Sequence, residues 1–167
     1  MRFVSRSPEQ TRAAGRALGA ALGGGGLAVA LRGPLGAGKT LFVKGLAEGL
    51  GIDPRAVASP TFTIASEYRA PDGRRLAHVD LYRVESEGEL EAAGFLDLLE
   101  PGTVLAVEWA DRFPAALPAD RLEVAIERAP GAGAPERRVL HAKACGEVSR
   151  AVCARWHPAS SGTARPA

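Results

Sequence analysis

The sequence has few cysteines, no long hydrophobic run and almost no net charge. Its two cysteines, Cys145 and Cys153, form no C-x-x-C pair, which excludes a disulfide framework and favours free thiols in a cytoplasmic protein. No apolar stretch approaches the ~20 residues that cross a bilayer, and residues 1–6 lack a signal-peptide core. The 21 basic residues nearly balance the 19 acidic ones, which gives no general reason to expect membrane or direct nucleic-acid binding.

The length of 167 residues fits one domain with its own hydrophobic core. We expect this domain to occupy residues 1–146. From about Ser149 the chain turns to small residues, arginine and proline, so we expect residues 147–167 to form a mobile tail. A metal site built from Cys145, Cys153 and His157 is a less favoured alternative, because only three candidate ligands lie in this segment.

Residues 33–40 carry the strongest functional signal. Their sequence, G-P-L-G-A-G-K-T, fits G-x-x-x-x-G-K-[ST] at every fixed position. The apolar run 27–31 before them predicts a buried strand, and the apolar spacing over 41–50 predicts a helix that stops at Gly51. Strand, glycine loop and helix in this order indicate a phosphate-binding loop, although an ordinary glycine-rich turn would share its composition.

The chemistry of phosphate binding explains the spacing of this loop. Glycines let the backbone curl so that successive N–H groups point at one anion, and the following helix adds its positive N-terminal end. Lys39 is expected to reach the β- and γ-phosphates, and the Thr40 hydroxyl to take a Mg²⁺ position. The positions expected to bind the nucleotide are Gly33, Leu35, Gly36, Ala37, Gly38, Lys39 and Thr40.

The rest of the chain predicts alternating helices and strands. A helix is expected to begin after Ser7 and to run through Leu22, and another to run from Ser86 to Gly94, each with a capping-box pattern. The alternating or continuous apolar patterns predict strands at 59–68, 76–83, 103–107, 121–128 and 138–143. The first two strands flank the turn 71–73, which predicts an antiparallel hairpin.

Two carboxylates and a threonine are candidates for chemistry beside the loop. Glu108 follows a buried strand, where ligands of parallel sheets bind; the less favoured alternative is a glutamate that ends the strand in water. His78, Asp80 and Tyr82 share one strand face, which either lines a site or faces solvent. Thr61 could sense a γ-phosphate through Mg²⁺, but β-propensity alone would also explain a threonine there.

Four motifs occur in the order and spacing of the bacterial TsaE family, formerly YjeE. They are 33–40, S-P-T-F-T at 59–63, H-V-D-L-Y-R at 78–83 and V-E-W at 107–109. The chain resembles this family from about Thr11 to the 138–143 strand. TsaE is the ATPase of tRNA threonylcarbamoyladenosine biosynthesis. The resemblance implies an α/β fold: a single P-loop NTPase domain with a mixed central sheet, antiparallel hairpin additions and flanking helices.

The resemblance also implies roles for single residues, with ATP and Mg²⁺ as cofactors. The expected catalytic residues are Asp80, Thr61 and Lys39. The expected ligands of Mg²⁺ are Thr40 and Glu108, with Trp109 as the aromatic residue beside the metal carboxylate. Thr11 matches a residue near the nucleotide. Arg137 or Arg138 would supply the basic residue that relatives place near the base.

The resemblance implies a partner as well. TsaE proteins act with a TsaD–TsaB heterodimer, which modifies adenosine 37 of tRNAs that read codons beginning with adenine, so tRNA contact is expected through the partner. Two alternatives remain open: a small-molecule kinase and a non-catalytic, nucleotide-dependent assembly factor. The absence of an arginine-rich lid segment before the 104–109 strand argues against the kinase. The presence of Glu108 and Asp80 argues against the assembly factor.

Overall fold

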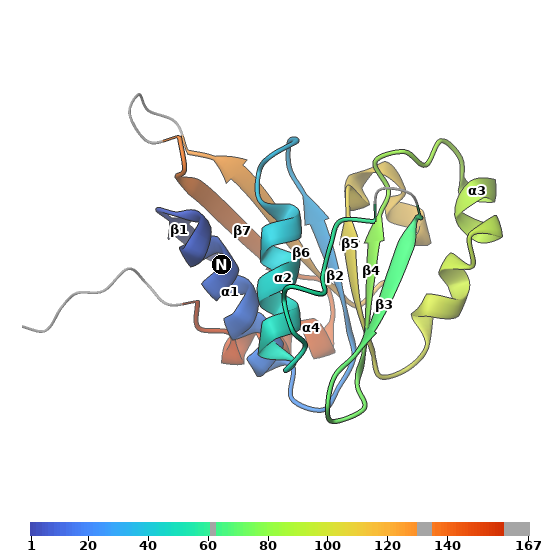
Figure 1. Cartoon of the computed structure of the whole chain (residues 1–167), viewed down its shortest axis with the longest axis horizontal. Coiled ribbons are helices and arrows are strands. Elements are labelled where there is room, and N and C mark those ends of the chain that lie inside the picture. The colour runs from blue at the N-terminus through green and yellow to red at the C-terminus, as the bar shows by residue number, and fades with distance from the viewer. Residues whose placement is uncertain (61–62, 130–134, 159–167) are drawn as a thin grey trace, which may run out of the picture.

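A mixed seven-stranded sheet forms the centre of the chain (Figure 1). The computed structural model describes residues 1–60, 63–129 and 135–158, and within them the strand order is β1-β7-β6-β2-β5-β4-β3. The strands are β1 (Arg2–Ser5), β2 (Leu27–Arg32), β3 (Ala65–Arg69), β4 (Arg75–Asp80), β5 (Thr103–Glu108), β6 (Arg121–Arg128) and β7 (Arg138–Ala144). The central four, β6, β2, β5 and β4, run parallel, and the outer pairs are antiparallel. The predicted mixed α/β fold is confirmed.

Helices cover the sheet on both faces. They are α1 (Pro8–Ala21), α2 (Lys39–Gly49), α3 (Glu87–Ala92) and α4 (Glu147–Arg155), with short 3₁₀ helices η1 (Phe95–Leu99), η2 (Ala110–Arg112) and η3 (Pro114–Ala116). We call the side that packs on α1, α2 and α4 the helix face, and the side that packs on α3 and the 3₁₀ helices the turn face. No helix in the described ranges is long and apolar enough to cross a membrane.

Alternation along each strand builds two separate cores. On β2, Leu27, Val29 and Leu31 belong to the cluster of the helix face, while Ala28 and Ala30 belong to that of the turn face. The side-chain period of two in a strand produces this division. Because both faces are covered, β2 and β5 are nearly continuous apolar runs, as is typical of buried parallel strands.

Glycines bring α1 and α2 into unusually close contact. A side-chain methyl group at Gly45 would overlap the carbonyl oxygen of Arg12, and one at Gly15 would overlap the carbonyl oxygen of Phe42. Gly19 and Gly49 meet one turn further along in the same way. The two backbones therefore touch, which fixes the start of α2 relative to the rest of the helix face.

The loop before β3 differs from the predicted strand at 59–68. The strand begins only at Ala65, because its antiparallel partner β4 ends at Asp80 and the register pairs Ala65 with Val79. Ser59 and Pro60 therefore lie beyond the last available hydrogen-bonding partner, and Pro60 has no N–H to donate. The expected strand 76–83 likewise ends at Asp80, while the hairpin around 71–73 is confirmed.

The start of the segment that we expected to form a mobile tail, residues 147–156, packs against the domain. Residues Glu147–Arg155 form α4, and Val152 and Trp156 are buried against the helix face. The Trp156 indole Nε1 donates to the carbonyl oxygen of Ala14 at 2.9 Å, and its ring packs edge-on against Phe42. Val152 and Trp156 are four positions apart and lie on the same side of the helix, which is enough to attach a short helix to the core. The sequence did not reveal this, because the residues around them are mostly polar or small. Residues 159–167 lie outside the described ranges.

Candidate functional site

The phosphate-loop sequence adopts backbone conformations that suit glycine. Gly33, Gly36 and Gly38 have φ angles of 141°, 73° and 109°, a region in which a side chain would be strained. A methyl group at Gly33 would also overlap the carbonyl oxygen of Ile126. Gly38 is the N-cap of α2 and supplies no side-chain cap. Because glycine has no side chain, the N-cap residue does not occupy the first N–H groups of α2, which can then bind an anion.

Lys39 lies inside the loop with only 4% of its surface exposed. Its Nζ donates to the carbonyl oxygens of Gly33 at 2.7 Å and Pro34 at 3.1 Å, and it lies 3.9 Å from the centroid of the Trp109 ring. Burial lowers the pKa of Lys39 from its ordinary value, and the negative charge of Glu108 opposes this shift. The ammonium group has three N–H donors and gives two of them to these carbonyl oxygens, which leaves one for an anionic ligand.

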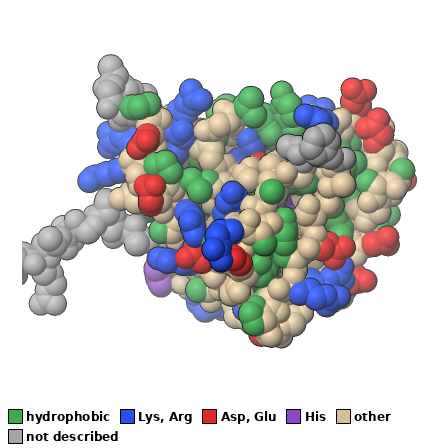
Figure 2. All heavy atoms as spheres, viewed as in Figure 1, with side chains coloured by type: hydrophobic (Ala, Val, Ile, Leu, Met, Phe, Trp, Pro, Cys, Tyr) green, Lys and Arg blue, Asp and Glu red, His purple; other side chains and the backbone are tan. Residues whose placement is uncertain are grey.

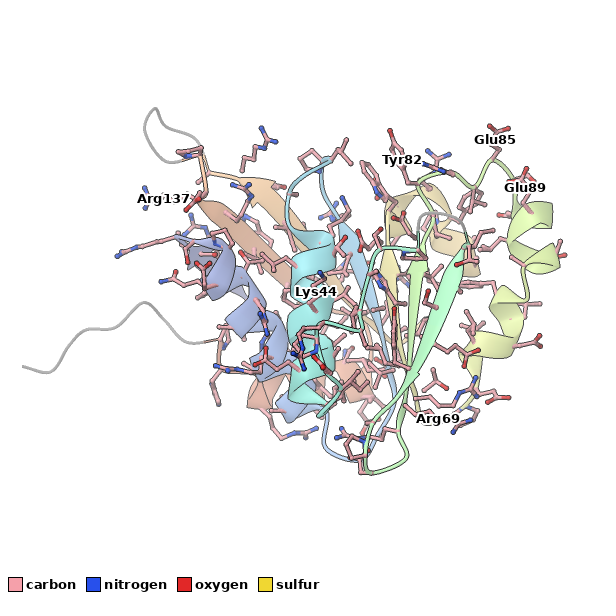
Figure 3. The ribbon with its side chains drawn as sticks, in the orientation of Figure 1. Lys44, Arg69, Tyr82, Glu85, Glu89 and Arg137 are labelled. Carbon is pink, nitrogen blue, oxygen red and sulfur yellow. The ribbon has the colours of Figure 1, made fainter. Side chains whose placement is uncertain are left out.

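Trp109 takes a backbone conformation that is rare for a bulky residue. Its φ of 57° is the one positive value among the described non-glycine residues. The residue comes directly after β5, and its ring packs against Tyr82 with centroids 4.9 Å apart and an angle of 40° between the ring planes. Tyr82 lies just beyond β4 (Figure 3). Such outliers concentrate at functional sites, and this one directs the indole toward Lys39.

Thr40 and Glu108 meet although 68 positions separate them in sequence. The Thr40 hydroxyl donates to Oε1 of Glu108 at 2.7 Å. Parallel pairing places Glu108 opposite Leu31, near the end of β2, from which the loop leaves. Glu108 is 3% exposed, which excludes the alternative of a strand-end glutamate in water. A hydroxyl that donates its proton to a carboxylate keeps its oxygen lone pairs for a cation.

His78 and Asp80 lie on the next strand of the same sheet. Asp80 is opposite Glu108 in the register, and it accepts hydrogen bonds from the Ser59 hydroxyl at 3.1 Å and from the Tyr82 backbone N–H at 2.9 Å. His78 is fully buried and contacts Glu108. The alternative of a solvent-facing side is therefore wrong for His78, while Asp80 is half-buried and Tyr82 is 49% exposed.

The donor set fits Mg²⁺ better than a metal held by protein ligands alone. No group of three or more histidine, cysteine, aspartate or glutamate side chains in the described ranges could hold a metal. The carboxylate of Glu108 and the hydroxyl of Thr40 supply hard oxygens at one point. Mg²⁺ typically takes one or two such protein ligands and completes its octahedron with water and phosphate oxygens.

The remaining expected residues lie at different distances from this centre. Thr11 is buried beside Gly38, and its hydroxyl bonds to Ser5 at 2.8 Å. Leu35 is 71% exposed near the middle of the loop. Arg137 is exposed at the β7 edge of the molecule (Figure 3). Thr61 lies outside the described residues.

Arg138, rather than Arg137, contacts the loop. Its guanidinium group donates to the carbonyl oxygens of Ala37 at 2.9 Å and Gly36 at 3.3 Å. The sequence allowed either arginine, with Arg137 counted among the nucleotide-binding residues, because Pro135 and Glu136 interrupt the usual pattern there. In a strand, a shift of one position reverses the side-chain direction. Sequence reasoning also noted His78 only as a member of a polar face, and missed its bond to Glu108.

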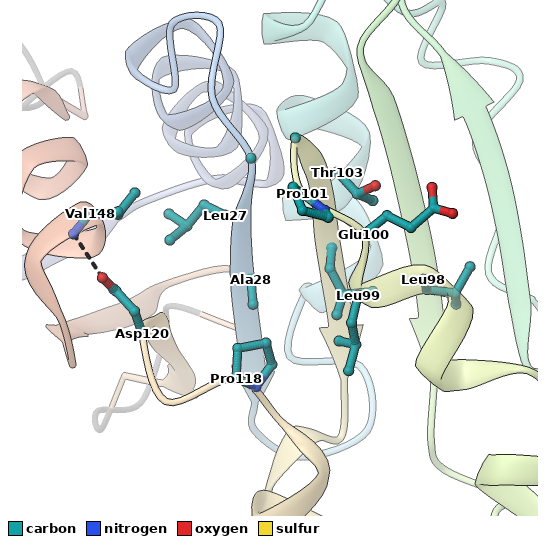
Figure 4. Close-up of a pocket in the computed structure, with 13 residues that line it drawn as sticks. Leu27, Ala28, Leu98, Leu99, Glu100, Pro101, Thr103, Pro118, Asp120 and Val148 are labelled. Atoms are coloured by element: carbon teal, nitrogen blue, oxygen red, sulfur yellow. Dashed lines mark hydrogen bonds between the residues drawn. The ribbon is translucent and has the colours of Figure 1, made fainter.

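Two cavities lie at opposite ends of the parallel strands. One, of about 430 Å³, adjoins the loop and is lined by Leu35, Ser59, Asp80 and Tyr82, among others. The other, of about 190 Å³, lies where β2 and β5 begin, with Ala28, Leu99 and Pro118 in its wall (Figure 4). Parallel sheets bind ligands at the carboxyl ends of their strands, so the first cavity belongs with the candidate site.

The sheet, the glycine loop and the strand-end carboxylates together define the fold of the P-loop NTPases. Residues 5–139 match the family described as "Threonylcarbamoyl adenosine biosynthesis protein TsaE", and the chain belongs to this TsaE family.

Individual relatives agree with this assignment. The chain is 43% identical over 158 residues to the tRNA threonylcarbamoyladenosine biosynthesis protein TsaE of Bacillus subtilis, covering 90% of this chain and 94% of the relative. It is 43% identical over 138 residues to the protein of that name from Streptomyces coelicolor, with 81% and 91% coverage. The crystal structure of Bacillus subtilis YdiB matches with a TM-score of 0.69 at 35% identity, covering 93% of each chain.

Proposed function

We propose that this protein is a Mg²⁺-dependent ATPase that serves the biosynthesis of threonylcarbamoyladenosine in tRNA. The pathway is that of its family. The observation that carries the ATPase assignment is the hydrogen bond from Thr40 to Glu108, formed at the start of α2 beside the buried Lys39. This arrangement matches the threonine and acidic residue that hold Mg²⁺ in P-loop NTPases.

Each group of the site would have one task. Lys39 and the backbone N–H groups of the loop would bind the β- and γ-phosphates of ATP. Thr40 and Glu108 would hold Mg²⁺, which supplies charge neutralisation on the phosphates when bound. Asp80 would orient the attacking water from its fixed position between Ser59 and Tyr82. Thr61 would complete the site from the segment that begins at Ser59.

A partner protein would complete the catalytic site by fixing a segment that the isolated protein holds weakly. We propose that the protein acts in the cytoplasm with a TsaD–TsaB heterodimer and contacts tRNA through it. Ser59 is tied to Asp80 by a single side-chain hydrogen bond, so docking a partner against the 59–63 segment would change the groups that position water. Hydrolysis by the isolated protein is therefore expected to be slow.

Steady-state ATP hydrolysis, alone and with purified TsaD–TsaB, tests the proposal. We expect slow hydrolysis that requires Mg²⁺, rises with the partner and disappears in Lys39→Ala. Lys44→Ala is the matched control, because it removes the same kind of side chain from the same helix (Figure 3). Phosphate transfer to a small acceptor would instead identify a kinase. ATP-dependent assembly without turnover would identify a non-catalytic factor.

A further inference from the structure

His78 is a histidine buried inside β4, two residues before the expected catalytic Asp80. Its side chain is 0% exposed, and its partner in the register with β5 is Ala106. Residues two positions apart share a strand face. On the face that carries His78, the residues that follow one another toward the carboxyl ends of the strands are Leu76, His78 and Asp80 on β4. Their partners on β5 are Val104, Ala106 and Glu108. His78 therefore lies between an apolar pair, Leu76 and Val104, and an acidic pair, Asp80 and Glu108.

One hydrogen bond identifies the tautomer of this imidazole. Nε2 lies 2.9 Å from Oε1 of Glu108. A carboxylate oxygen only accepts, so we assign the proton to Nε2. The other nitrogen, Nδ1, is buried and has no hydrogen-bond partner among the described residues. An apolar side chain of similar size would leave no polar atom unpaired, so packing explains the volume of His78 but not its chemistry.

Oε1 of Glu108 receives donors from two different elements. Thr40 of α2 donates at 2.7 Å and His78 of β4 at 2.9 Å. Two donors restrict rotation of a carboxylate more than one. Side chains that bind metals are commonly oriented in this way by a hydrogen-bonded neighbour.

We propose that His78 is a positioning residue, whose Nε2–H holds the Glu108 carboxylate in place for Mg²⁺–nucleotide binding. This inference rests on the proposed function. Without His78, Thr40 would be the one hydrogen-bond donor left to the carboxylate among the described residues, and the Thr40 hydroxyl must also serve the metal. His78 itself would contact neither the nucleotide nor the metal.

Replacing His78 with leucine and with glutamine distinguishes the effect of the Nε2–H donor from the effect of the side-chain volume. His78→Leu keeps an apolar side chain of similar size without a donor, while the amide of His78→Gln returns an N–H near Nε2. Val79→Ala is the control for buried damage, because Val79 is equally buried on the same strand but packs on the turn face. Affinity for N-methylanthraniloyl-ADP is measured in EDTA and across a Mg²⁺ titration, together with thermal unfolding.

In EDTA, we expect His78→Leu to bind the probe with the same affinity as the unmodified protein. In the titration, it should need about 10–100-fold more Mg²⁺ to reach half of the maximal increase in probe affinity. His78→Gln should recover most of this loss, and Val79→Ala should change only the unfolding temperature. Equal Mg²⁺ dependence in the leucine and glutamine variants would overturn the inference. An unmodified protein that binds the probe with no Mg²⁺ enhancement would instead refute the proposed function. If His78→Leu does not fold, His78→Asn, with its shorter amide, replaces it.

The histidine ring signals give a readout that is independent of nucleotide. The chain has three histidines, of which His78 is fully buried while His141 and His157 are exposed. In protein labelled with ¹⁵N-histidine and free of nucleotide, we expect one ring in the Nε2–H tautomer with a slowly exchanging proton. That signal should shift in Glu108→Gln. A buried ring protonated on Nδ1 alone would overturn the assignment.

Discussion

The helix face and the turn face of the sheet are covered by different means. On the helix face, α1 has 14 residues and α2 has 11, and glycines bring their backbones into contact. On the turn face, α3 has six residues and is followed by 3₁₀ helices. All the side chains proposed to hold phosphate or metal approach from the helix face or the strand ends. The helix face therefore carries the groups proposed to hold phosphate and metal, while the turn face contributes Val84 and Glu89 to the wall of the cavity beside the loop.

Charge separates the same two regions. Residues 84–111, which include α3 and η1, contain eight acidic residues and no lysine or arginine. Acidic side chains accordingly gather at the α3 end in Figure 2, whereas basic ones lie mainly over the rest of the view. Glu85 and Glu89 mark this acidic end in Figure 3. The net charge is thus close to zero, but the acidic and basic side chains are distributed unevenly over the molecule.

Truncating a buried phenylalanine on each face should give the largest effects. Phe42 is 0% exposed on the helix face and Phe95 is 2% exposed on the turn face. Each change to alanine should lower the free energy of unfolding by about 3–5 kcal/mol, measured by urea denaturation. Only Phe42→Ala should also weaken nucleotide binding under conditions in which the variants remain folded, because α2 carries the loop. Equal nucleotide affinity in both variants would contradict the comparison.

A pair of glycine substitutions sharpens the comparison. Gly45→Ala forces a methyl group onto the Arg12 carbonyl, so the free energy of unfolding should fall by about 1–3 kcal/mol despite the better helix propensity of alanine. A methyl group at Gly88 in α3 would meet only the Ser86 hydroxyl oxygen, at an ordinary contact distance of 3.9 Å, so Gly88→Ala should raise stability by up to about 1 kcal/mol. Thermal unfolding of both proteins measures the difference. Stabilisation by Gly45→Ala would show that the helices can move apart.

The attachment of α4 should give the smallest effect, and one that depends on pH. Asp120 accepts from the backbone N–H groups of Val148 at 2.8 Å and Ser149 at 3.0 Å (Figure 4 shows the first). Hydrogen bonding by the Ser149 side chain, and to a lesser extent by these two backbone N–H groups, lowers the pKa of Asp120 from its usual value. Its contribution is thus present above the unfolded pKa of about 3.9 and is lost as the pH falls through the lower folded pKa.

Asp120→Ala should therefore lower the free energy of unfolding by about 1 kcal/mol at pH 7. The difference from the unmodified protein should shrink toward zero once the pH falls below about 3.9. Urea midpoints at several pH values measure this. The exposed Asp97 of η1 supplies the control, since Asp97→Ala should change little at any pH. A difference for Asp120→Ala that persists in acid would exclude the carboxylate as its cause.

The sequence predicted the elements whose signals are local. The N-cap Ser7 accepts from the backbone N–H of Gln10, as the capping box requires, but the Gln10 side chain accepts from Arg6 rather than from Ser7. The alternating patterns located β6 and β7 with little error. β1 was missed, because four residues at the start of a chain show too short a pattern.

By itself, the sequence determined the phosphate loop, since its glycines, Lys39 and Thr40 are contiguous and their conformations are set by local sterics. It also indicated that Glu108 lies at the end of its strand, whereas it extended the strand that ends at Asp80 by three residues. Only the tertiary structure decided that His78 and Thr40 meet on one oxygen of Glu108, that Arg138 contacts the loop, and that Trp156 secures α4. These contacts join residues 30 to 142 positions apart, and packing fixes them through backbone approaches and strand registers that no local pattern contains.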